Sequence, residues 1–119
     1  MVPSTRFAIL AAEAKRHIRE VTAAEARQQQ AAGAILIDVR ESEDFAQGHA
    51  ADALHLSRGV LELKIEDVAP DVATPIICYC GGGSRSALAA ESLQKMGYTN
   101  VASLAGGFKA WKAGGLATS

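Results

Sequence analysis

The sequence predicts a single α/β domain, built as a mostly parallel sheet with helices on both faces and an additional helix at the N-terminus. Its 119 residues, 49% of them hydrophobic, suffice for one domain with a core of its own. Short, continuous apolar runs are typical of strands that are buried on both faces. These runs alternate with segments of helical spacing, which indicates βα units and parallel strand pairing.

The first expected helix covers residues 4–20. Phe7, Leu10, Ala14 and Ile18 follow the spacing of three and four residues that places apolar side chains on one stripe of a helix. We treat residues 1–20 as a helical extension and residues 21–119 as the domain proper. The extension is expected to pack on the domain, or to mediate contact with a second copy or a partner protein.

The second helix has a clear start and end. Thr22 and Glu25 have the spacing of a capping box, so this helix should begin at Ala23, and Gly33 should end it in a left-handed conformation. Strands are expected at residues 34–38, 54–56, 76–79 and 101–103. Further helices are expected at residues 41–47, 60–68, 85–96 and 108–113, the third of them ending at Gly97 with Tyr98 against Leu93.

Composition excludes several classes of protein. A net charge of −1 and a pI near 6.3 argue against nucleic acid as the main partner, because phosphate binding needs a basic face. Two cysteines cannot form a disulfide framework, which favours a reducing compartment and a cytoplasmic location. We find no secretory or membrane-spanning segment. The three histidines have no metal-ligand spacing with the cysteines, so neither a metal nor another cofactor is expected.

The most informative stretch follows the apolar run at residues 76–79. Cys80 opens a loop of three glycines, and the loop leads directly into a helix whose first turn carries Arg85. Successive glycines allow backbone N–H groups to point inward as an anion-binding nest, and the helix N-terminus adds positive potential. This setting predicts a stabilised thiolate at Cys80. No Lys-Ser/Thr pair follows the glycines, so the signature of a nucleotide-binding P-loop is absent.

Cys78 receives a different interpretation. It lies within the apolar strand, where a cysteine commonly behaves as a small hydrophobic residue. Core packing is therefore the preferred role, with a resolving thiol as the alternative.

Several sequence blocks, in this order, resemble a single-domain rhodanese of the rhodanese-like sulfurtransferase superfamily. The blocks are Ile37-Asp38-Val39-Arg40 with Glu43 and Phe45, Gly48-His49 before Ala53-Leu54-His55-Leu56, Cys80 to Arg85, Gly97-Tyr98 with Val101, and Gly106-Gly107-Phe108 with Trp111. The resemblance covers residues 21–115 and implies a five-stranded sheet.

The resemblance also implies a sulfur shuttle. Cys80 is expected to take a sulfane sulfur from thiosulfate or another persulfide donor and to pass it to cyanide or a thiol acceptor. The residues expected to bind the persulfide or substrate are Gly81, Gly82, Gly83, Ser84, Arg85 and Ser86. Asp38 and Arg40 match a family motif near the strand ends and are expected to support the site, although a buried ion pair that holds the loops is an equal alternative.

Loop length separates two chemistries on this fold. Phosphatases of the cell-cycle dual-specificity class resemble the domain but use a loop one residue longer, whereas Cys80 and Arg85 here enclose four residues. Sulfur transfer is therefore expected. A sulfur-relay or redox binding module that acts with a partner protein is the alternative, and a phosphatase-like use of the loop follows it.

Two departures from the family pattern stand out. Relatives often have Gly-His-Ile-Pro-Gly-Ala where this chain has residues 48–53, so the turn into the next strand is expected to differ. The loop after Cys80 contains no lysine, which predicts that thiosulfate is a weak donor. Arg58 is the nearest candidate for a compensating cation.

Overall fold

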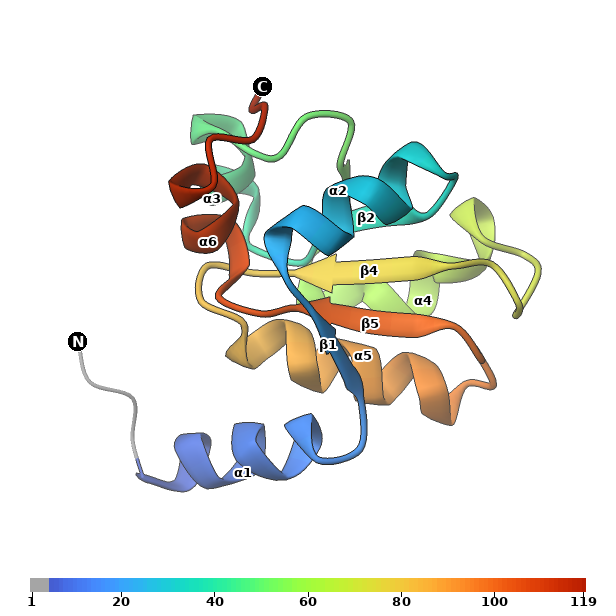
Figure 1. Ribbon diagram of the computed structural model, residues 1–119. Coiled ribbons are helices and arrows are strands. Elements are labelled where there is room, and N and C mark those ends of the chain that lie inside the picture. The colour runs from blue at the N-terminus through green and yellow to red at the C-terminus, as the bar shows by residue number, and fades with distance from the viewer. Residues whose placement is uncertain (1–4) are drawn as a thin grey trace.

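The computed structural model describes residues 5–119, which form a layered α/β domain (Figure 1). The strands are β1 (Arg19–Val21), β2 (Ile35–Asp38), β3 (Leu54–His55), β4 (Ile76–Tyr79) and β5 (Val101–Leu104). The helices are α1 (Thr5–Lys15), α2 (Ala23–Ala31), α3 (Ser42–Gln47), the 3-10 helix η1 (Arg58–Val60), α4 (Leu61–Val68), α5 (Ser84–Lys95) and α6 (Gly107–Ala113).

All five strands pair in parallel, in the spatial order β1-β5-β4-β2-β3, which confirms the predicted fold class. The central strand β4 pairs with both β2 and β5. This register sets Cys78 opposite Ile37 on one side and Ser103 on the other. Since the carboxyl ends of parallel strands meet at one edge of the sheet, the residues that follow β2 and β4 lie at the same edge.

Each face of the sheet has its own apolar core. On one face, α4 and α5 pack against alternate residues of β2, β4 and β5, among them Ile37 and Cys78. On the other face, α2 and α6 cover the intervening residues, among them Leu36 and Tyr79. Figure 1 shows the two helical layers on opposite sides of the strands. Cys78 and Cys80 therefore lie on the α5 side, and Tyr79 lies on the α6 side.

The predicted extent of the first helix is wrong. α1 ends at Lys15, and Arg19–Val21 form an edge strand that pairs with β5. The capping box explains the change, because Thr22 as the N-cap of α2 is itself extended, and the edge of β5 supplies hydrogen-bonding partners for the residues before it. β1 therefore spans the expected boundary after residue 20. Residue 4, the predicted helix start, lies outside the described residues.

α1 packs along α5 (Figure 1). It buries Ala11 and Ala14, and the Nδ1 atom of His17 lies 3.3 Å from the carboxylate of Glu91 on α5. Leu10, which is predicted to lie on the buried stripe, is 55% exposed. The neighbouring Ile9 is exposed as well. The interpretation that the helix packs on the domain agrees with this arrangement.

Apart from η1, which the sequence analysis does not predict, the remaining elements lie within about two residues of their predicted positions. The capping box is formed, with Thr22 Oγ1 accepting from Glu25 N at 3.1 Å. Gly97 has a φ of +101°, and Tyr98 N donates to Leu93 O at 3.1 Å, which is the predicted glycine-ended helix. Within residues 5–119, no helix is both long enough and apolar enough to cross a membrane.

Candidate active site

The loop that joins β4 to α5 wraps around the sulfur of Cys80. Sγ lies 3.2 Å from Gly83 N, 3.4 Å from Ser86 N and 3.5 Å from Ser86 Oγ, and each of these groups can donate a hydrogen bond to a thiolate. Gly83 has a φ of +102°, a left-handed conformation that glycine adopts without steric cost. Cys80 itself is only 2% exposed. The loop thus surrounds one sulfur atom with N–H and O–H donors.

These donors determine the acidity of the thiol. Burial by itself raises the pKa of Cys80, but the Ser86 hydroxyl and the amides of Ser86, Gly83 and Gly82 together lower it below the ordinary value. The sequence interpretation gave Arg85 a share in this effect. In the structure the hydrogen bonds from Ser86, Gly83 and Gly82 offset the effect of burial and lower the pKa of Cys80.

Cys78 has the opposite environment. It is completely buried between sheet and helices, and burial raises the pKa of its thiol to about 12. At neutral pH this cysteine is a protonated apolar residue of the core, in agreement with the preferred sequence interpretation.

The start of α6 holds the cysteine loop from the other side. Phe108 N donates to the carbonyl oxygen of Cys80 at 2.8 Å, and Lys109 N donates to that of Gly81 at 3.3 Å. Gly107 allows this close approach, because a Cβ atom there would lie 2.5 Å from the Cys80 oxygen, and its φ is +58°. The sequence analysis names Gly107 and Phe108 only as part of the family resemblance and does not predict that they contact the cysteine loop. The pair of glycines before an aromatic residue was the available signal.

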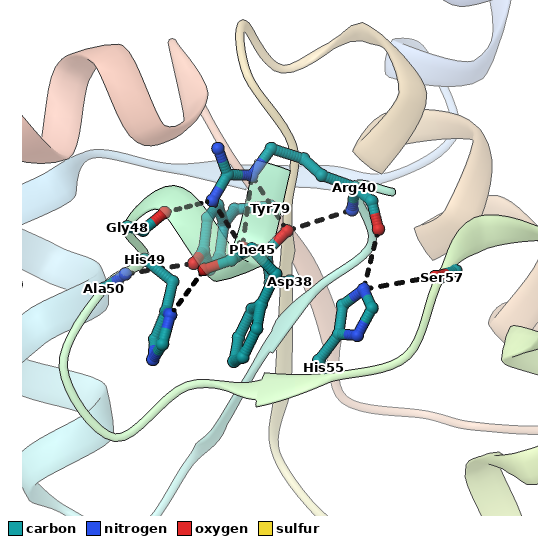
Figure 2. A network of polar contacts seen from close by, with 9 residues as sticks. All are labelled: Asp38, Arg40, Phe45, Gly48, His49, Ala50, His55, Ser57 and Tyr79. Atoms are coloured by element: carbon teal, nitrogen blue, oxygen red, sulfur yellow. Dashed lines mark hydrogen bonds and ion pairs between the residues drawn. The ribbon is translucent and has the colours of Figure 1, made fainter. Parts of the chain in front are cut away.

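Asp38 and Arg40 form a buried ion pair (Figure 2). Within residues 5–119, neither side chain forms a hydrogen bond with Cys80. Arg40 Nη2 lies 2.8 Å from Asp38 Oδ2, and the same nitrogen donates to the carbonyl oxygen of Gly48 at 2.7 Å. Burial lowers the pKa of Arg40, but Asp38 and Tyr79 together raise it above the ordinary value, so the guanidinium stays charged. The guanidinium carbon also lies 4.5 Å from the Phe108 ring centre. The pair thereby connects the end of β2 to the helix that holds the loop.

Two histidines stack on either side of Phe45, next to this ion pair (Figure 2). The ring centres of His49 and Phe45 lie 3.7 Å apart, and His49 Nδ1 is 2.9 Å from the Phe45 carbonyl oxygen. His55 Nε2 lies 2.8 Å from the carbonyl oxygen of Arg40 and 3.1 Å from Ser57 Oγ. These contacts give both histidines structural partners, and neither has a hydrogen bond with the cysteine loop.

Within residues 5–119, Arg58 forms no hydrogen bond to Cys80 or its loop, although its charge acts on the neighbouring Cys78. Its guanidinium binds both carboxylate oxygens of Glu62, at 3.0 and 2.8 Å, and donates to Ser92 Oγ at 2.9 Å. Arg85, by contrast, lies half-buried in the first turn of α5, and within residues 5–119 its guanidinium forms no hydrogen bond or ion pair. Arg85 is therefore the cation of the two that remains available to an anion at the loop.

Residues 48–53, where the sequence departs from the family pattern, form a turn with one non-glycine residue in the left-handed region. Asp52 stands where relatives often have glycine, and its φ is +65°, the left-handed region that Asp tolerates better than most residues. The chain still enters β3 in register with β2, with Leu54 opposite Ile37. At this turn, Asp52 therefore occupies a backbone conformation that favours glycine.

Comparisons with known proteins agree with the observed fold. The family model described as Rhodanese-like domain matches residues 22–114. A Rhodopseudomonas palustris protein of unknown function, described as a possible tyrosine phosphatase, is 29% identical, with a TM-score of 0.87 over 100% of this chain and 98% of its own.

Two solved sulfurtransferase structures are also similar. Thiosulfate sulfurtransferase from Pseudomonas aeruginosa is 36% identical, with a TM-score of 0.78 over 85% of this chain, which spans 20% of that larger chain. The homodimeric polysulfide-sulfur transferase of Wolinella succinogenes is 26% identical, with a TM-score of 0.81 over 96% of this chain and 87% of its own.

Proposed function

Because the chain belongs to the rhodanese-like family, we propose that it is a sulfurtransferase in which Cys80 carries the transferred sulfur. The observation that supports this most strongly is the ring of donors around Sγ: two amides and one hydroxyl within 3.5 Å of a sulfur whose pKa is lowered. A thiolate is the nucleophilic form of cysteine, and the same donors fit the extra negative charge of a persulfide.

The proposed reaction has two displacement steps. The Cys80 thiolate attacks the outer sulfur of thiosulfate or of another persulfide donor, the donor's S–S bond breaks, and sulfite or a thiolate leaves with the electron pair. A thiol or cyanide then attacks the outer sulfur of the Cys80 persulfide. The new S–S bond breaks, the product leaves as a persulfide or thiocyanate, and the Cys80 thiolate is restored without a cofactor.

The roles of the loop residues follow from this reaction. The amides of Gly82, Gly83 and Ser86 hold the sulfur, and Arg85 attracts the anionic donor at the mouth of the loop. Gly81 and Ser84 complete the turn. Asp38 and Arg40 keep the neighbouring loops in place. We also propose a cytoplasmic location, where free thiols stay reduced.

Intact-mass measurement tests the covalent step. Incubation with thiosulfate or polysulfide is expected to add about 32 Da to the protein, and Cys80→Ser is expected to abolish both the adduct and thiocyanate formation. Cys78→Ser serves as the matched control and is expected to retain the adduct. Wild-type turnover by Cys80→Ser removes the proposed mechanism.

The same mass and thiocyanate assays distinguish between possible sulfur donors and between turnover and a relay to a partner protein. With no lysine in the loop, we expect polysulfide to load Cys80 at lower concentration than thiosulfate. Loading without turnover to cyanide favours the alternative role, a relay that passes sulfur to a partner protein. Hydrolysis of p-nitrophenyl phosphate at a comparable rate favours phosphatase chemistry, the activity suggested for the Rhodopseudomonas palustris protein.

The two arginines provide a further test of donor binding. Arg85→Ala is expected to raise KM for thiosulfate, because its guanidinium is free to meet an anion. Arg58→Ala is expected to leave KM unchanged, because Glu62 and Ser92 occupy its guanidinium. A raised KM in Arg58→Ala alone reverses this assignment.

A further inference from the structure

A second buried serine lies behind the donors of Cys80. Ser86 Oγ, which is 3.5 Å from Cys80 Sγ, is also 2.8 Å from the Oγ atom of Ser103 on β5. Ser86 and Ser103 have no exposed surface, and Cys80 is 2% exposed. The three side chains therefore form a chain of polar atoms that runs from the sulfur into the core of the domain.

The chemistry of the hydroxyl group fixes the direction of these hydrogen bonds. A hydroxyl has one proton to donate and two lone pairs to accept, whereas a thiolate can only accept. When Cys80 is deprotonated, the Ser86 proton is directed at Sγ, and Ser86 Oγ is left as an acceptor. Within residues 5–119, the Ser103 hydroxyl has no hydrogen-bonding partner other than Ser86, so its proton completes the chain.

The strand register holds Ser103 in this position. Ser103 pairs with Cys78 across β5 and β4, and Cys80 follows two residues later on the same face of the sheet. A side chain in the middle of a paired, buried strand has little freedom to move away. Ser103 thus presents its hydroxyl to α5 from a rigid element.

We propose that Ser103 is a positioning residue for the reactive cysteine, because its hydroxyl donates to Ser86 Oγ and so directs the Ser86 proton to Cys80 Sγ. Ser103 contacts neither the sulfur nor a substrate in this role. Successive hydrogen bonds polarise one another, so the second hydroxyl strengthens the first. When Cys80 is protonated, both bonds reverse, with the thiol donating to Ser86 and Ser86 donating to Ser103. This inference rests on the proposed function, in which the thiolate is the reacting group.

The rate of Cys80 alkylation by iodoacetamide, measured against pH, tests the proposal without a sulfur donor. Ser103→Ala is expected to move the midpoint of this profile upward and to slow alkylation about two- to threefold on its acidic side. Ser86→Ala is expected to have a larger effect. In a Ser86→Ala background, Ser103→Ala is expected to add nothing, because Ser103 acts through Ser86.

Val101→Ala is the matched control, since Val101 is buried on the same face of the same strand. It is expected to lower Tm without moving the alkylation midpoint. The proposal is overturned if Ser103→Ala leaves the midpoint unchanged, or if its effect persists in the Ser86→Ala background. A protein that forms no persulfide but shows the predicted coupling contradicts the proposed function and leaves the role of Ser103 intact.

Discussion

Replacement of Gly107 by alanine tests whether the start of α6 holds the cysteine loop in its active shape. A Cβ atom at this position would lie 2.5 Å from the Cys80 carbonyl oxygen and 2.7 Å from the backbone of Gly81. Cβ atoms essentially never approach other atoms within 3.0 Å, so the two segments must separate by at least about 0.5 Å. The displaced atoms are backbone atoms, which cannot rotate away as a side chain can.

This displacement falls on the residues that present the donors. A misplacement of about 1 Å in a catalytic arrangement costs roughly 10²-fold in rate, so we expect the sulfur-transfer rate of Gly107→Ala to fall about tenfold or more. The φ of +58° adds strain of about 1–2 kcal/mol for a residue with a side chain. Initial rates of thiocyanate formation and thermal unfolding measure the two effects separately.

Gly115→Ala is the control for strain alone. Gly115 has a similar φ of +71°, but no atom lies within 4 Å of its added Cβ. Gly115→Ala is therefore expected to lose about 4–8 °C in Tm from backbone strain alone. Gly107→Ala is expected to lose more, because its Cβ also clashes with the backbone of the loop. Only Gly107→Ala is expected to lose activity well below its Tm. Equal activity in the two variants would refute the assigned role of α6.

Three further predictions follow from the described contacts. Iodoacetamide at pH 7 is expected to label Cys80 and not Cys78. The rate should rise with pH through a midpoint below the usual ~8.5, because the pKa of Cys80 is lowered and its thiolate therefore forms at lower pH. Asp52→Gly is expected to stabilise the protein by about 0.5–1 kcal/mol through relief of the left-handed strain, measured by urea unfolding. Arg40→Ala is expected to cost about 3–5 kcal/mol, because it leaves the Asp38 carboxylate buried and unpaired.

Each of these predictions has a contradicting outcome. Equal labelling rates for the two thiols exclude a specially activated Cys80. Asp52→Ala is the comparison for Asp52→Gly and is expected to destabilise the protein, so a stabilised alanine variant contradicts the strain argument. An unchanged urea midpoint in Arg40→Ala shows that solvent reaches Asp38.

Most elements of the fold could be predicted because their signals are local. The capping box at Thr22, the glycine at residue 97 and the apolar run at residues 76–79 each act through neighbours in sequence. The predicted first helix extends too far towards the C-terminus, because residues 19–21 instead form β1. This strand is held by pairing with β5, some 80 residues later in the chain. Local spacing carries no information about a strand whose partner is so distant.

For the candidate site, too, the features that depend on neighbouring residues could be predicted, and those that depend on distant contacts could not. The order of residues from Cys80 to Ser86 was enough to predict a cysteine in a nest of N–H groups, because loop, glycines and helix start are contiguous. The source of the lowered pKa was not predictable in detail. The sequence predicts contributions from the N–H groups, the helix N-terminus and Arg85 together, and the structure adds the Ser86 hydroxyl to the hydrogen bonds that offset burial.

By itself, then, the sequence determined the fold class, the family resemblance and the choice of Cys80 as the cysteine proposed to react, since each depends on residues that are neighbours in the chain. Only the tertiary structure decided which distant groups serve that cysteine. It brought Gly107 and Phe108 against the loop, set Ser103 behind Ser86, and tied Arg58 to Glu62. The physical reason is that hydrogen bonds and steric contacts act over a few ångströms in space, and parallel strands bring together residues that are far apart along the chain.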